Sequence, residues 1–111
     1  MRIIIYAGDE YLTGDDIADA LLEYSRALGD DDRAEIIEIP VRNDVGKVVS
    51  AKFLIGPASQ IVTEAVEGRG PEVVDAELVA RLHQLTRAVE RPSSEPLATE
   101  DVSTFEIDGT I

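Results

Sequence analysis

The chain has 111 residues, 44% of them hydrophobic and 5% aromatic, which suits one globular domain with an aliphatic core. Its 23 Asp and Glu residues outnumber its 10 Lys and Arg residues, so the formal net charge is −13. A surface of this charge repels nucleic-acid phosphates and anionic lipids, and we expect the chain to bind neither. The absence of cysteine excludes disulfides, thiolate nucleophiles and Cys-based metal sites.

The first residues predict a β-hairpin. Residues 2–6 form an apolar strand, residues 7–10 carry turn formers, and residues 11–13 can return as a short second strand. The chain thus opens on a strand rather than on a signal peptide, and no apolar run approaches the ~20 residues of a spanning helix. We therefore expect a cytoplasmic protein.

An amphipathic helix of about four turns follows the hairpin. Its apolar stripe recurs at helical spacing and consists of Ile17, Leu21, Tyr24 and Leu28. Thr13 is the expected N-cap, with Asp16 in the capping-box position, and Gly29 is the expected end of the helix.

The middle of the chain predicts two strands and a loop. Residues 37–42 and 49–55 alternate apolar and polar side chains, and residues 43–46 have the composition of a hairpin loop. Pro40 lacks an N–H, which favours an edge position or a bulge for its strand. Residues 57–67 fit either a helical face or a strand, and their Ile-Val-Thr run favours the strand.

The second amphipathic helix is expected to begin after an Asp75 cap and to end before Pro92. Its stripe consists of Leu78, Leu82, Leu85 and Val89. Together these elements predict an α+β fold of order ββαβββα, an antiparallel sheet of about five strands with both helices on one face. Residues 1–91 would form this single domain.

Residues 92–111 are expected to form a C-terminal tail that can add a last strand at residues 104–107. Lys47 and Lys52 are the only lysines available to block pairing at a sheet edge. We therefore expect self-association, as a homodimer, with the C-terminal segment pairing on a neighbouring chain.

Two acidic groups are candidate sites for a hard cation such as Ca²⁺ or Mg²⁺, because such ions prefer carboxylate oxygens. The groups are Asp30, Asp31 and Asp32, and Asp15, Asp16 and Asp19. Neither matches an EF-hand spacing, and a solvated turn or the positive end of a helix dipole also explains them.

No catalytic or cofactor-binding residue is predicted. His83 falls away from the apolar stripe of its helix and is expected to be exposed, without a nucleophile or a second histidine nearby in the sequence. Ser59 lacks the glycines of a nucleophile elbow, and a turn explains it. In residues 106–109 the Asp-Gly pair of the nucleic-acid ligase signature is present, but Glu106 stands where the adduct-forming lysine is required.

The strand, loop and Thr13-Gly14 helix start resemble the beginning of a flavodoxin-like protein. Asp9, Glu10, Asp15 and Asp16 crowd the place where a phosphate would have to bind, which argues against this interpretation.

Short motifs along the chain also resemble a family of small uncharacterised actinobacterial domains of unknown function. They are Tyr6, Gly14-Asp15-Asp16, Gly56-Pro57-Ala58-Ser59, Gly70-Pro71-Glu72 and Glu95-Pro96. The resemblance implies a bacterial source and the fold described above, and it implies no activity.

The sequence therefore favours a non-enzymatic protein-interaction or regulatory module without a cofactor, since an acidic surface suits a cationic or protein partner. The alternative is a small metal- or nucleotide-using enzyme centred on the acidic hairpin and the first helix.

Overall fold

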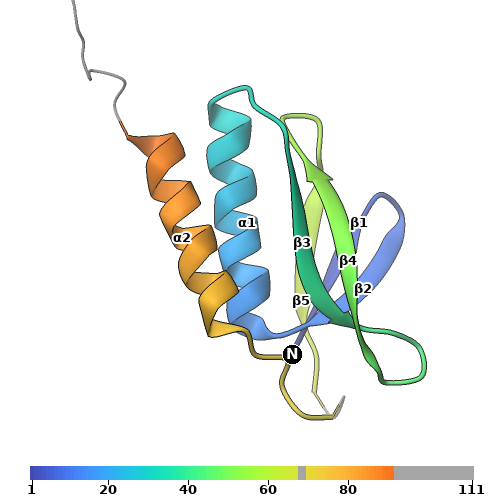
Figure 1. Cartoon of the computed structure of the whole chain (residues 1–111). Coiled ribbons are helices and arrows are strands. Elements are labelled where there is room, and N and C mark those ends of the chain that lie inside the picture. The colour runs from blue at the N-terminus through green and yellow to red at the C-terminus, as the bar shows by residue number, and fades with distance from the viewer. Residues whose placement is uncertain (68–69, 92–111) are drawn as a thin grey trace, which may run out of the picture.

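Five antiparallel strands form one sheet, and two helices lie on the same side of it (Figure 1). The computed structural model describes residues 1–67 and 70–91. The element order confirms the predicted ββαβββα fold. The elements are β1 Arg2–Tyr6, β2 Asp9–Thr13, α1 Asp15–Asp30, β3 Glu35–Arg42, β4 Val48–Ile55, β5 Ile61–Ala65 and α2 Ala76–Glu90.

The sheet order is β4-β3-β2-β1-β5, and the β1–β2 hairpin meets the β3–β4 hairpin in a short β2–β3 junction. β3 and β4 are paired over eight positions, whereas β2 and β3 are paired only at Leu12 and Arg42. Close to that junction the Thr13 hydroxyl donates a 2.7 Å hydrogen bond to the Pro40 carbonyl oxygen. β3 is internal in the strand order and pairs with β4 without a bulge, but β2 is paired with it only at Arg42. Pro40 therefore lies where one side of β3 is unpaired, as at a sheet edge, although β3 is not an edge strand.

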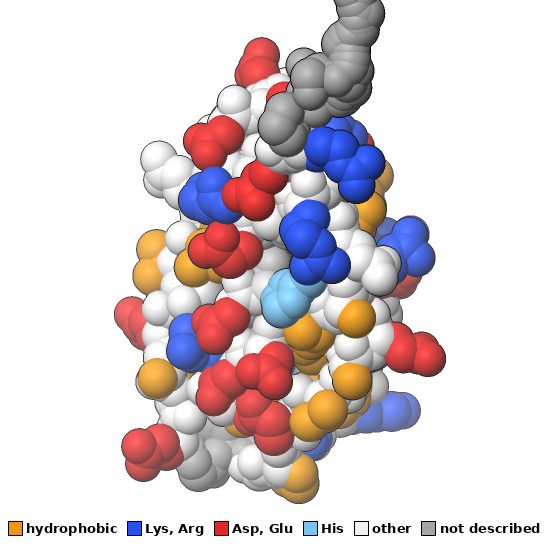
Figure 2. Space-filling model, turned by 90° about the vertical axis from the view of Figure 1, so that its left-hand side faces the viewer, with side chains coloured by type: hydrophobic (Ala, Val, Ile, Leu, Met, Phe, Trp, Pro, Cys, Tyr) orange, Lys and Arg blue, Asp and Glu red, His pale blue; other side chains and the backbone are white. Residues whose placement is uncertain are grey.

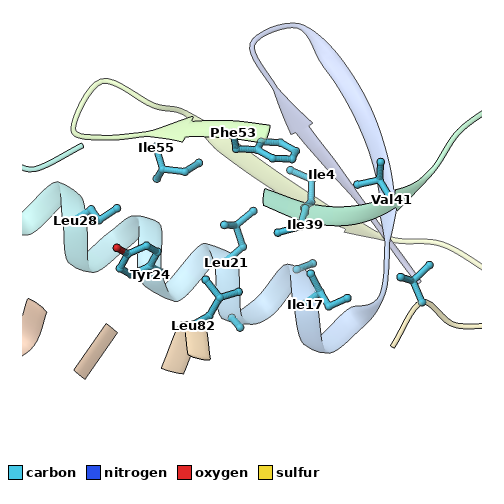
Figure 3. Close-up of a cluster of buried hydrophobic side chains, with 13 residues drawn as sticks. Ile4, Ile17, Leu21, Tyr24, Leu28, Ile39, Val41, Phe53, Ile55 and Leu82 are labelled. Atoms are coloured by element: carbon cyan, nitrogen blue, oxygen red, sulfur yellow. The ribbon is translucent and has the colours of Figure 1, made fainter. Parts of the chain in front are cut away.

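The hydrophobic core lies between α1 and the inner face of the sheet (Figure 3). The predicted stripe of α1 is buried throughout, and the buried strand residues alternate along β3 and β4 as predicted. α2 packs on α1 and buries Leu82 completely, whereas Leu78, Leu85 and Val89 remain partly exposed. The strand prediction for residues within 57–67 is confirmed by β5.

The ends of α1 differ from the prediction. Gly14, not Thr13, is the N-cap, and the Glu72 carboxylate accepts the Asp15 N–H at 2.7 Å. At the other end the helix continues past Gly29 to Asp30, and Asp32 adopts the left-handed conformation with φ 55°. The expected cap of α2 is confirmed, since Asp75 accepts the Leu78 N–H at 3.1 Å.

In residues 1–67 and 70–91 no helix is both long and apolar enough to cross a membrane. The tail and its expected strand at residues 104–107 lie outside the described residues.

Candidate functional site

A hollow of about 680 Å³ opens where the end of β4 approaches the end of β1. We call it the β4–β5 hollow. Its lining comes from β1 and the turn after it, from the end of β4, and from the link to β5. The lining residues are Ile5, Tyr6, Ala7, Gly8, Ala34, Leu54, Gly56, Pro57, Ala58, Ser59, Gln60 and Val62.

The sheet curls so that β4 and β1 approach each other beside the short β4–β5 link. β4 and β5 are at opposite edges of the sheet, yet only residues 56–60 connect them. This link contains a turn, in which the Ser59 N–H donates to the Gly56 carbonyl oxygen at 3.0 Å, so it reaches less far than the about 20 Å of a fully extended chain of this length. The Tyr6 hydroxyl of β1 donates a hydrogen bond to the Leu54 carbonyl oxygen of β4, which joins the two sides.

Three aromatic rings pack together at this curled end of the sheet. Phe53 lies 5.3 Å from Tyr6 and 4.9 Å from Tyr11 between ring centroids, both in tilted or edge-on geometry. Such pairs stabilise by about 0.5–1.5 kcal/mol beyond their buried area. The curled end is therefore held by packing as well as by the Tyr6 hydrogen bond.

Two tight turns shape the rim of the hollow. Ala7 and Gly8 have φ of 52° and 85°, the conformation of a two-residue hairpin turn whose twist matches the strands. In the β4–β5 link, the Ser59 hydroxyl accepts the Gly56 N–H at 3.0 Å and donates to the Leu54 carbonyl at 3.3 Å. Ser59 is thus a turn residue, and its hydroxyl is already engaged by two backbone groups.

The hollow carries no Asp, Glu, Lys, Arg or His among its lining residues, although the chain has a net charge of −13. Two of its aliphatic side chains face solvent: Leu54 is 60% exposed and Val62 is 52% exposed. Ile5 lies directly opposite Val62 across the β1–β5 pair, so the two side chains share one face. The result is an uncharged, mainly apolar surface at one end of the sheet, with Ser59 and Gln60 among its polar members.

Two of the three acidic residues at the start of α1, Asp15 and Asp19, are engaged in ion pairs, and Asp16 is exposed. Asp15 lies 3.0 Å from the Met1 α-amino nitrogen and 3.6 Å from Arg2, and Asp19 lies 2.9 Å from Arg2. Glu72 completes this group at 2.8 Å from the amino nitrogen. We call Met1, Asp15 and Glu72 the amino-terminal cluster.

Hydrogen bonding shifts two pKa values in the amino-terminal cluster. Hydrogen bonds to Glu72 first and to Asp15 second raise the pKa of the Met1 α-amino group above its ordinary 8.0. The bond from the amino terminus, followed by the Asp15 N–H, lowers the pKa of Glu72 below its ordinary 4.5. Both groups are therefore held in their charged forms over a wider pH range.

The second acidic group is spread around the end of α1. Asp30 pairs with Arg26 at 3.1 Å, Asp31 lies 3.6 Å from Arg33, and Asp32 occupies the turn after the helix. Within residues 1–67 and 70–91, no three Asp, Glu or His side chains gather in an arrangement that could hold a metal ion. The ligase-like residues 106–109 lie outside the described residues.

His83 is exposed, as predicted, and borders a second, smaller hollow of about 310 Å³. Figure 2 shows this histidine on the helical side of the molecule, with carboxylates and apolar side chains near it. Asp16, Glu72 and Asp75 contribute to the same hollow. Of these, Glu72 bonds the amino terminus and Asp75 caps α2, so two of the three carboxylates are used by the fold.

The hairpin also bears on the flavodoxin-like interpretation. After β1 the chain turns directly into β2, and α1 begins only after this second strand. β1 is antiparallel to both of its neighbours. The strand–loop–helix start expected of a flavodoxin-like sheet is therefore not formed.

No protein family matches this sequence, and no curated protein or solved structure is significantly similar to it. The resemblance to the actinobacterial family stays a prediction.

Proposed function

We propose that this chain is a non-enzymatic protein-interaction module and that the β4–β5 hollow receives apolar side chains of a protein partner. One observation carries the proposal: an uncharged hollow with exposed Leu54 and Val62 in a strongly acidic chain. Contiguous exposed apolar surface is unfavourable in water and marks interaction sites. The volume of the hollow, about 680 Å³, lies within the range of ligand pockets.

The carboxylates near the hollow favour a partner whose apolar residues are flanked by Lys or Arg. Glu10 lies opposite Ile5 across the β1–β2 pair, and Glu64 lies two residues beyond Val62 on the same face of β5. Neither carboxylate forms an ion pair with another residue in the described part of the chain. Complementary charge at the rim of an interface speeds association and selects among partners.

Selection of peptides from a displayed library on the full chain tests the proposal. We expect the enriched peptides to carry one or two large apolar residues beside Lys or Arg. The variant Val62→Asp should lose binding to the selected peptides, because it places a charge within the apolar surface. Val45→Asp is the matched control, since Val45 is 83% exposed in the β3–β4 loop, outside the hollow.

Equal binding by wild type and Val62→Asp would contradict the proposal, provided that circular dichroism shows the variant to be folded. A thermal-shift screen with divalent cations and nucleotides separates the enzyme alternative. A ligand that binds only the folded state raises the melting temperature when it is in excess. An interaction module should show no such shift.

A further inference from the structure

The free edge of β4 differs from that of β5 in length and charge. β4 pairs only with β3, and its eight residues include no carboxylate. β5 pairs only with β1, has five residues and contains Glu64. Short, charged edge strands resist pairing with another chain, whereas long, apolar edge strands favour it. In a chain of net charge −13, both lysines, Lys47 and Lys52, lie at or within β4. β4 is therefore the least acidic edge of the sheet, and a register that pairs two copies must keep Lys52 from lying directly opposite its copy, because lysines on an edge oppose pairing.

Three apolar side chains of β4 are exposed to solvent. Val48 is 46% exposed, Val49 is 37% exposed and Leu54 is 60% exposed. Val49, Ala51 and Phe53 point to the inner face, and Val48, Ser50, Lys52 and Leu54 point to the outer face, because side chains alternate along a strand. A strand added at this edge would cover side chains of β4 on both faces of the sheet.

We propose that two copies of this chain pair through β4 as a symmetric antiparallel dimer centred on Ala51. In this register Val49 lies opposite Phe53 of the second copy on the inner face. On the outer face Val48 lies opposite Leu54 of the second copy, and Lys52 lies opposite Ser50. Apolar residues therefore meet apolar residues, and Lys52 has Ser50 as its direct partner, with Lys52 of the second copy only as a diagonal neighbour.

Neighbouring registers are less favourable. Centring the pair on Lys52 would place the two lysine ammonium groups opposite each other, which is destabilising. A shift by a single residue would place inner-face side chains opposite outer-face side chains. The small side chain of Ala51 also suits the symmetry axis, where two identical residues face each other. The interface uses the same patch on both copies, so it closes at two chains.

This proposal goes beyond the proposed function and uses a different surface, although Leu54 borders both. At the end of β4, Tyr6 and Ser59 already bond the Leu54 carbonyl oxygen. The backbone pairing of two copies therefore rests on residues 49–53, because Val48 lies opposite Leu54 in this register.

Sedimentation of the full chain and its variants tests the dimer. We expect wild type to dimerise in a concentration-dependent manner, more strongly at high salt, because salt screens the repulsion between two acidic chains. Val48→Asp and Val49→Asp should each shift the chain to monomer, while Val62→Asp, at a position 52% exposed on β5 at the opposite edge of the sheet, should leave the dimer unchanged. A monomer at every concentration and salt level, or a dimer that persists in both β4 variants, would overturn the proposal.

A cysteine crosslink tests the register directly, because the natural chain contains no cysteine. Directly opposed residues of antiparallel strands have Cα atoms about 4.5–5.5 Å apart, within the range of a disulfide. Ala51→Cys should therefore give a covalent dimer on oxidation, and Val45→Cys in the β3–β4 loop should remain monomeric on a denaturing gel. Failure of Ala51→Cys to crosslink beyond the level of Val45→Cys would reject this register. Val62→Asp should keep the dimer, so failure of the proposed hollow function is distinguishable from failure of this interface.

Discussion

The α-carbon of Gly14 faces the carbonyl oxygen of Val73 so closely that a β-carbon at position 14 would overlap this oxygen. Gly14 is the N-cap of α1 and is buried, and Val73 belongs to the segment that leads to α2. The contact therefore fixes the start of the first helix against the approach to the second.

Gly14→Ala should destabilise the protein by about 3 kcal/mol, because the new methyl group can be accommodated only by moving backbone. Gly29→Ala is the matched control: its β-carbon meets nothing within 4 Å, and alanine favours the helix by about 0.5–1 kcal/mol. Chemical denaturation of both variants measures the difference. A loss below 1 kcal/mol in Gly14→Ala would show that the two segments are not held together as described.

Leu21 of α1 and Leu82 of α2 are both fully buried. Leu21→Ala and Leu82→Ala should each cost about 2–5 kcal/mol, since each removes buried methyl groups and leaves a cavity. Leu22→Ala, at a position 36% exposed on α1, should cost much less. Equal losses in urea denaturation for Leu21→Ala and Leu22→Ala would contradict the orientation of the helix.

These helical stripes could be predicted from the sequence because they depend on residues three or four positions apart. The contacts that set the start of α1 could not be predicted from the sequence. Thr13 has the side chain of a good N-cap, but its hydroxyl donates to Pro40, 27 residues away. The Asp15 N–H is instead bonded by Glu72, 57 residues away. Local capping rules give no signal for partners at such distances.

The β4–β5 hollow was missed for the same reason. Each lining segment is a recognisable turn or strand in the sequence, but the hollow exists only because Tyr6 meets Leu54, 48 residues away. The signal that could have indicated it is the short link between β4 and β5. A five-residue link between strands at opposite edges of the sheet favours their approach, but the strand order that places them there is known only from the structure.

Ala7→Gly should stabilise the protein by about 0.5–1 kcal/mol. Ala7 has φ 52°, where a β-carbon costs about 1–2 kcal/mol, and the greater freedom of glycine in the unfolded chain offsets part of the gain. Gly8→Ala, at φ 85°, should have the opposite sign. Thermal and urea unfolding of the two variants measure both effects. A destabilised Ala7→Gly would show that the turn is not in the left-handed conformation.

The amino-terminal cluster should give the stability a specific pH dependence. The Met1 α-amino group has its pKa raised above 8.0, so its contribution to stability is complete below pH 8.0 and is lost as the pH rises through the folded-state pKa. Glu72 has its pKa lowered below 4.5, so its contribution is complete above pH 4.5 and is lost as the pH falls through the folded-state pKa. Between these limits both groups are charged and paired.

Glu72→Gln removes the carboxylate and keeps the shape of the side chain, so it isolates this electrostatic contribution. We expect the difference in unfolding free energy between wild type and Glu72→Gln to be greatest between pH 4.5 and 8.0 and to shrink on both sides. Glu64→Gln is the control, because no ion pair involves Glu64 within residues 1–67 and 70–91, and its difference from wild type should vary little over this range. Urea denaturation over a pH series, with NMR titration of the amino group, measures both limits. A difference for Glu72→Gln that does not change with pH would rule out the amino-terminal pair as its source.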